Sequence, residues 1–223
     1  MDCINLSHKN LRSEDITKLV NNFIDISKSS SPQYFITTVK LGYNDLKDEG
    51  AAVVASFLKS NRTITCLDLG FNGIGDIGME SLSKALSLNV APIQVLYLSG
   101  NLLTSVGFQS LSKSIALNNT LKTLYLTGNT GKEEGAKFIS GGLEHNYSID
   151  KLCLNGNKIG SLGSKSISQL LLRNHTITHI NLVIFFLFKF IYQLTINSLN
   201  RVITIFRTMV SLTWLNLYMN IDR

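Results

Sequence analysis

A glycine-rich stretch is the first part of this 223-residue sequence that could do chemistry. Gly73, Gly75 and Gly78 have the GxGxxG spacing that lets a turn and a helix N-terminus bind a dinucleotide pyrophosphate. The strand expected next, at residues 95–98, lacks the acidic residue that would bind a ribose hydroxyl. Gly78 recurs at the same place in every copy of a longer pattern, whereas the other two glycines do not. We therefore interpret the match as accidental and expect no nucleotide cofactor.

The other residues that could act as acids, bases or metal ligands lack the spacing of a catalytic or metal site. His175 and His179 fall in an expected loop and an expected strand, so they do not form a helical metal pair. The acidic pairs at 48–49 and 133–134 fall in first helical turns, where carboxylates favour the helix dipole. HExxH, CxxC, GxSxG and P-loop patterns do not occur in the sequence. These observations predict that the protein is not an enzyme and binds no metal or cofactor.

The three cysteines, Cys3, Cys66 and Cys153, have neither metal-ligand nor disulfide-framework spacing. Cys3 and Cys66 take equivalent positions two strands apart, which places them about 10 Å from each other and beyond disulfide reach. We expect free thiols, which are typical of a reducing compartment. The first residues lack the basic and apolar regions of a secretory signal. The sequence therefore predicts a cytoplasmic location.

Apart from Cys3, these residues lie on a pattern that recurs along residues 36–182. Each copy pairs two apolar residues of an expected strand with an asparagine three residues after the second. The closing asparagines are spaced by 28, 29, 28 and 28 residues: Asn44, Asn72, Asn101, Asn129 and Asn157. A regular period of this length predicts a solenoid of stacked units.

The unit becomes clear when its copies are aligned at position one on Ile36, Ile64, Ile93, Leu121 and Ile149. Positions four and six are apolar, position fifteen is glycine, and position twenty-six is asparagine. Positions nineteen and twenty-three are also apolar, and this four-residue step places both on one face of a helix. Each unit thus predicts a short strand, a turn and a helix. Because strands lie about 4.8 Å apart and packed helices about 8 to 10 Å apart, the stack must bend with its strands inside.

The form LxxLxLxxNxLxxxGxxxLxxxLxxN resembles the leucine-rich repeat family, in its ribonuclease-inhibitor-like subclass. Similar repeats occur in ribonuclease inhibitor, NOD-like receptors and the Ran GTPase-activating protein. The resemblance covers about two thirds of the chain and implies an α/β leucine-rich repeat solenoid, shaped as a horseshoe. Its parallel β-sheet is expected on the concave face and its helices on the convex face.

The pattern also sets the expected boundaries within a solenoid at residues 1–182. Residues 1–35 form a degenerate first repeat, 36–176 form five regular repeats, and 177–182 begin the next. In the first repeat, Lys9 replaces the asparagine and Asp15 the glycine. Its apolar positions are taken by Ile4, Leu6, Leu11, Leu19 and Phe23.

The pattern breaks at residues 183–211, an irregular apolar segment. Three interpretations stay open: a transmembrane helix, a divergent repeat, or a gene-model artefact such as a translated intron from an A+T-rich gene. The best apolar window contains Asn181, Lys189 and Gln193, so the sequence does not favour a membrane span. Residues 212–223 then read as a partial terminal repeat.

The sequence makes structural predictions for the asparagines at positions nine and twenty-six and for one glycine. The position-nine asparagines should bond backbone groups along the stack, because a side-chain amide has both donors and an acceptor. Gly131 stands at position eleven, where other repeats have Leu or Ile, so we expect this turn to be the loosest. Four Asn-x-Ser/Thr matches coincide with the position-twenty-six asparagine and are interpreted as unglycosylated: Asn61, Asn118, Asn146 and Asn174.

Composition limits the class of partner. The chain is 44% hydrophobic and 16% charged, as expected for a folded protein, and its net charge of +6 is shared evenly between residues 1–182 and 183–223. Because the repeats carry no basic stripe, we expect no nucleic-acid binding. Nor does any motif predict a small-molecule substrate.

Binding is expected on the concave face, where strand positions three, five, seven and eight project. This face is nearly neutral, with aromatic residues at its centre. Tyr97 and Tyr125 share position five on adjacent strands and should lie side by side, either as binding anchors or as a cross-strand pair. The candidate partner-binding residues are Lys40, Tyr43, Asp68, Phe71, Tyr97, Ser99, Tyr125, Thr127, Lys151 and Asn155.

Two classes of function follow. The first is a noncatalytic protein-protein interaction scaffold that binds a protein partner on its concave face. The alternative, implied by the resemblance alone, is a regulator of a small GTPase similar to the Ran GTPase-activating protein, or a sensor fragment of a NOD-like receptor-type protein. Arg12 and Arg62 are the first two arginines, and neither lies in a matching catalytic motif.

Overall fold

The computed structural model describes residues 2–28 and 36–182, in which strands and helices alternate. The strands are β1 (Asp2–Asn5), β2 (Ile36–Lys40), β3 (Cys66–Asp68), β4 (Val95–Tyr97), β5 (Thr123–Tyr125), β6 (Lys151–Cys153) and β7 (His179–Asn181). The helices are α1 (Ser13–Lys28), α2 (Lys47–Leu58), α3 (Asp76–Leu86), α4 (Ser105–Leu117), α5 (Lys132–Leu143) and α6 (Gly160–Arg173). The expectations for residues 183–211 and 212–223 concern residues outside the described ranges.

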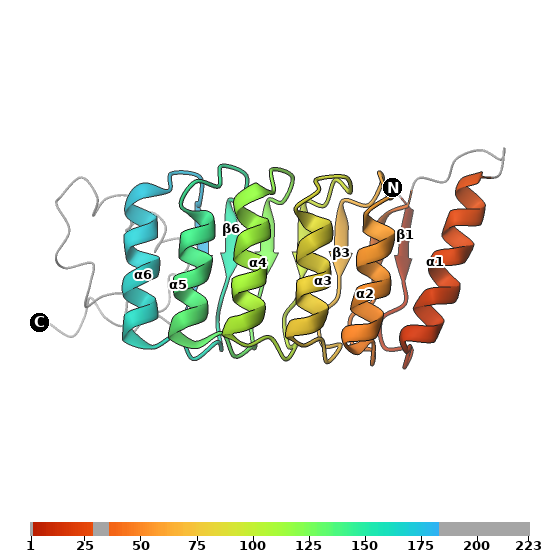
Figure 1. The fold of residues 1–223 in the computed structure, drawn as a ribbon, viewed down its shortest axis with the longest axis horizontal. Helices are drawn as coiled ribbons and strands as arrows, with labels where there is room; N and C mark the ends of the chain where they lie inside the picture. The colour runs from red at the N-terminus through yellow and green to blue at the C-terminus, as the bar shows by residue number, and fades with distance from the viewer. Residues whose placement is uncertain (1, 29–35, 183–223) are drawn as a thin grey trace, which may run out of the picture.

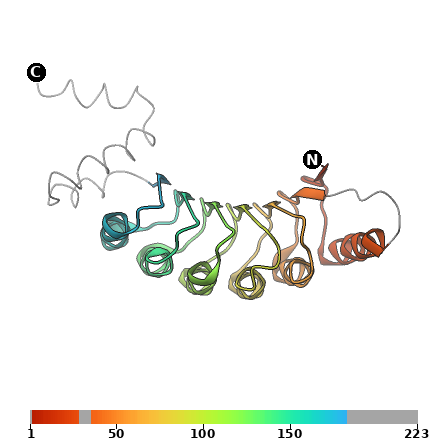
Figure 2. The same ribbon diagram turned by 90° about the horizontal axis from the view of Figure 1, so that it is seen from above.

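The strands form one parallel, open sheet in the order of the sequence. Its register advances by one repeat per strand, so that Leu67, Leu96 and Leu124 are direct neighbours. Figure 1 shows the helices side by side in a single layer that covers one face of the sheet. In Figure 2 the strands follow the inner side of a shallow arc and the helices its outer side. The expected solenoid, with a concave sheet and convex helices, is confirmed.

The core lies between the sheet and the helix layer. Strand positions four and six are buried in each regular repeat, as in Leu67 and Leu69, which are at most 1% exposed. The helix positions nineteen and twenty-three are buried with them. Position sixteen, which the sequence pattern does not mark as apolar, is equally buried: Ile16, Ala51, Met79, Phe108, Ala136 and Ser164. This position contacts the neighbouring repeat, and its side chain differs in size from one repeat to the next.

The turn at Gly131 differs from its expected structure, because the missing side chain leaves no empty space. A Cβ atom at Gly131 would lie 2.8 Å from the ring of Phe108, and one at Gly135 would lie 3.0 Å from it. Phe108 itself is fully buried at position sixteen of the preceding repeat. The gap that this expectation assumed is therefore absent, since a large side chain of one repeat fills the space left by the next.

The position-nine asparagines form the expected ladder. Asn101 donates from Nδ2 to the carbonyl oxygens of Leu69 and Leu98, each at 3.0 Å. Its Oδ1 accepts from the backbone N–H groups of Asn72 at 3.1 Å and Ile74 at 3.0 Å. Equivalent bonds to strand carbonyls are donated by Asn44, Asn72, Asn129 and Asn157. The amides thus satisfy backbone groups that the short strands leave unpaired.

Acidic residues connect successive helix N-termini. Asp48 accepts from the backbone N–H of Gly75 at 2.6 Å, and a Cβ at Gly78 would lie 2.7 Å from its carboxylate. Asp76 similarly accepts from the N–H groups of Thr104 and Gly107, both at 2.8 Å. Each carboxylate therefore caps the helix of the following repeat and not its own. In the GxGxxG stretch, the Asp48 carboxylate thus engages the backbone N–H of Gly75, a donor of the kind that binds phosphate at a helix N-terminus.

Candidate protein-binding face

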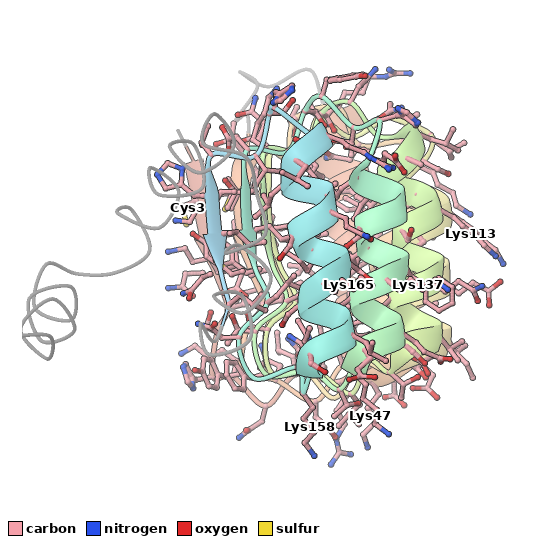
Figure 3. All side chains as sticks on the ribbon, turned by 90° about the vertical axis from the view of Figure 1, so that its left-hand side faces the viewer. Cys3, Lys47, Lys113, Lys137, Lys158 and Lys165 are labelled. Carbon is pink, nitrogen blue, oxygen red and sulfur yellow. The ribbon has the colours of Figure 1, made fainter. Side chains whose placement is uncertain are left out.

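Each strand turns alternate side chains to opposite faces of the sheet. Strands β3, β4 and β5 bury their central residue and leave the residues on either side half-exposed on the concave face. Figure 3 shows Cys3 on the sheet side of the molecule, whereas Lys137 and Lys165 project from the helix layer. The two faces of the solenoid therefore offer different chemistry.

The centre of the concave face holds a cluster of two tyrosines and a lysine. Tyr97 and Tyr125 are register partners on β4 and β5, and their rings stack with centroids 4.3 Å apart and planes 3° apart. Lys151 on β6 places its Nζ 5.3 Å from the centroid of the Tyr125 ring. The expectation that the two tyrosines lie side by side is confirmed. The stacked rings and the ammonium group form a continuous amphipathic surface.

The protonation of this cluster follows from burial and from contacts among its members. Burial, and then the neighbouring Tyr125, raise the pKa of Tyr97 to about 12. A hydrogen bond with Tyr125 raises the pKa of Lys151, which keeps its charge at neutral pH. Burial also raises the pKa of the Cys66 and Cys153 thiols beside the cluster. Both thiols stay protonated at neutral pH and are poor nucleophiles.

Other expected site residues have local partners. Asp68 accepts from the backbone N–H of Gly70 at 2.9 Å, so its carboxylate is held against its own turn. Asn155 donates from Nδ2 to Oδ1 of Asn181 at 2.6 Å, which links it to the strand β7. Lys40 is exposed on β2, where it is the register partner of Asp68. Ser99 and Thr127 are half-exposed just beyond β4 and β5.

Position eight carries a second aromatic group at the rim of the concave face. Tyr43 and Phe71 stack with centroids 4.4 Å apart, and His8 stacks on the other face of Tyr43 at 4.3 Å. The sequence reasoning missed His8. Aligning the first repeat on Met1 places His8 at position eight, and this alignment was the signal that could have found it.

The backbone at position eight is left-handed in each repeat. The φ angles of His8, Tyr43 and Phe71 are 58°, 58° and 55°, and the next three repeats have glycine there with φ between 67° and 73°. A residue other than glycine in this conformation costs about 1 to 3 kcal/mol. The three rings are therefore held in a backbone conformation that glycine would adopt without strain.

Comparisons with known proteins agree with this geometry. A family model described as Leucine Rich repeat matches residues 35–55 and 60–83. The chain contains leucine-rich repeats. A solved structure titled "Leiomodin-1 Actin-Binding Site 2 (ABS2)" is similar, with a TM-score of 0.53 and 17% sequence identity. The match covers 72% of this chain and 88% of that one. The fold of such repeats is generally used to bind proteins without catalysis.

The described part of this leucine-rich repeat protein contains no arrangement suited to metal or thiol chemistry. In residues 2–28 and 36–182, no three His, Cys, Asp or Glu side chains gather as a metal site, and the three cysteines are free. Arg173 is bonded to Glu144 at 2.7 Å. None of the helices in the same two ranges has the length and apolar character needed to cross a bilayer.

The four Asn-x-Ser/Thr matches at position twenty-six lie within the framework of the repeats. Asn118, Asn146 and Asn174 are at most 5% exposed, and their Nδ2 atoms donate to backbone carbonyls of the preceding repeat. Asn61 accepts from the backbone N–H groups of Thr63 and Ile64. These amides bond the backbone in the folded protein, and three of them are buried.

Proposed function

We propose that this protein is a noncatalytic interaction scaffold that binds a protein partner on its concave face. The observation that carries the proposal is the stacked pair Tyr97–Tyr125 with Lys151 beside it, at the centre of an open sheet. Tyrosine combines a large apolar ring with a hydroxyl that tolerates water, so it is common at the centre of protein interfaces. The candidate residues predicted from the sequence belong to this proposal.

The chemistry of the face supports a macromolecular partner. Its outward residues are half-exposed and spread over several strands, which suits contact with an extended surface. Burial raises the pKa of the Cys66 and Cys153 thiols on this face, so nucleophilic catalysis by these two residues has no support. We also propose a cytoplasmic location, which free thiols support, and membership of the ribonuclease-inhibitor-like subclass, which the 28-residue spacing and the helix in each repeat support.

The alternative functions gain no observation from the structure. Regulation of a GTPase would be tested by single-turnover GTP hydrolysis. The leiomodin title names an actin-binding site of that protein, and at 17% identity the likeness concerns the fold. Purified actin is therefore only one of the proteins whose binding would be measured.

Replacing both tyrosines is the direct test. We expect the double variant Tyr97→Ala/Tyr125→Ala to lose at least tenfold in affinity for its partner, because buried aromatic anchors contribute about 2 kcal/mol or more each at interface centres. The measurement is affinity capture from cell extract with quantitative mass spectrometry, followed by binding of the purified partner. Removal of the aromatic pair itself should cost about 0.5 to 1.5 kcal/mol of stability, which circular dichroism would measure.

The matched control is Lys137→Ala/Lys165→Ala, because Figure 3 shows both lysines on the helix layer. This variant should capture the partner as the unmodified protein does. If the tyrosine variant stays folded and captures the same partner with unchanged affinity, the central cluster is not the binding site.

A further inference from the structure

We propose that the stacked rings of His8, Tyr43 and Phe71, here called the aromatic ridge, bind an acidic segment of a protein partner. The segment would place a carboxylate side chain next to an apolar one. This inference rests on the proposed function, because the ridge lies at the rim of the same concave face. The inference adds a second contact with the partner, made by the N-terminal repeats and separate from the Tyr97–Tyr125 cluster.

The ridge presents ring edges to solvent. Both faces of the Tyr43 ring are covered, one by His8 and the other by Phe71, yet Tyr43 remains 50% exposed. The far face of Phe71 lies against Gly100, where any Cβ atom would overlap the ring, and Phe71 remains 47% exposed. The exposed parts are therefore mainly the edges. Aromatic edges carry partial positive charge, so they attract carboxylates and the faces of other rings.

Two exposed lysines lie near the ridge. Lys9 directly follows His8, and Lys40 lies on the strand that leads to Tyr43; both are exposed. Within the described residues, neither lysine has an acidic side chain in ion-pair contact. The nearby acids are engaged, since Asp45 pairs with Lys47 at 3.3 Å and Asp68 accepts from the Gly70 backbone. A carboxylate approaching the ridge therefore meets two available ammonium groups.

Backbone strain separates this ridge from an ordinary packing contact. The three ring-bearing residues have φ between 55° and 58°, whereas Gly100, Gly128 and Gly156 take the same position with φ between 67° and 73°. Glycine adopts this conformation without steric cost, so the rings lower stability at a place where glycine fits the fold. Because the rings are half-exposed, their burial offsets less of this strain than the burial of a core residue would. Strain of this kind is a reason to look for binding.

The test restores glycine at the ridge. The variant Tyr43→Gly/Phe71→Gly keeps the left-handed backbone, so its melting temperature should be unchanged or higher. The probe is a fluorescein-labelled twelve-residue peptide that alternates glutamate with leucine and tryptophan. We expect the unmodified protein to bind it, measured by fluorescence anisotropy at low ionic strength, and the glycine variant to bind at least tenfold more weakly. A second variant, Lys9→Glu/Lys40→Glu, should weaken binding by a similar factor.

Further variants and probes test whether the ridge binds an acidic peptide. The variant Tyr97→Ala/Tyr125→Ala should bind the peptide within twofold of the unmodified protein, so this result and the capture experiment on the central cluster can fail separately. The proposal is overturned if the glycine variant binds the peptide equally well, or if a peptide with lysine in place of glutamate binds as tightly. Tighter binding of a single-stranded oligonucleotide of the same charge would overturn it too. A melting temperature that falls sharply in the glycine variant would assign the ridge to folding and overturn the proposal as well.

Discussion

Phe108→Ala should lower the free energy of unfolding by about 3 to 5 kcal/mol, the largest loss expected from a single substitution in this solenoid. The ring is fully buried and fills the space above Gly131 and Gly135, where a Cβ atom would come within 2.8 Å and 3.0 Å of it. Its removal leaves a cavity between two repeats that backbone movement can close only in part. Urea denaturation followed by circular dichroism measures the loss.

A second substitution tests the reason for this loss. Other repeats have Leu or Ile at the position of Gly131, so Phe108→Ala/Gly131→Leu should regain part of the lost stability. Gly131→Leu alone should destabilise, because the new side chain would meet the Phe108 ring. If the double variant is no more stable than Phe108→Ala, the two positions do not compensate each other.

Asn129→Ala is expected to lower stability by about 1 to 3 kcal/mol, because it leaves buried backbone groups unpaired. Asn129 is 1% exposed, and its Nδ2 donates to the carbonyls of Leu98 at 3.0 Å and Leu126 at 2.9 Å. Its Oδ1 accepts from the backbone N–H of Leu103 at 3.2 Å. One side chain thus serves two repeats, and its loss should broaden the cooperative transition as well as lower its midpoint.

Asn119→Ala is the matched control, because Asn119 is an exposed asparagine outside the ladder. Its replacement should change the free energy of unfolding by less than about 0.5 kcal/mol, as is usual for surface substitutions. Equal losses in the two variants would mean that the ladder bonds add nothing beyond the general cost of replacing asparagine.

Features that recur in each repeat could be predicted from the sequence. The strand apolar positions, the asparagine ladder and the helix face all repeat in phase, because each repeat meets the same surroundings in the stack. Tyr97 and Tyr125 could be placed side by side for the same reason, since equivalent strand positions become register partners.

Features that join unlike residues of neighbouring repeats were harder to predict. Phe108 compensates for Gly131 in the next repeat, and Asp48 caps a helix that starts one repeat later. Aligning the repeats with one another shows which positions are equivalent, but it does not show which different positions of adjacent repeats come into contact. His8 was missed although the alignment of the first repeat on Met1 places it at position eight, equivalent to Tyr43 and Phe71.

The position of the aromatic side chains on the concave face could be predicted, whereas the hydrogen bond of Asp68 could not. Its carboxylate bonds the N–H of Gly70 two residues later, a local turn contact that alternation along a strand does not reveal. Burial pattern therefore predicted which side chains reach the concave face, and local hydrogen bonding decided which of them stay available to a partner.

The most direct test of binding through the concave face is site-specific photo-crosslinking. Benzoylphenylalanine in place of Thr123 would lie on the concave face between Val95 and Lys151, which are its register partners on β4 and β6. In place of Lys137 it would lie on the helix layer, as Figure 3 shows. We predict a crosslinked partner from position 123 and none from position 137. Crosslinks to the same partner from position 137 alone would contradict the assignment of the binding face.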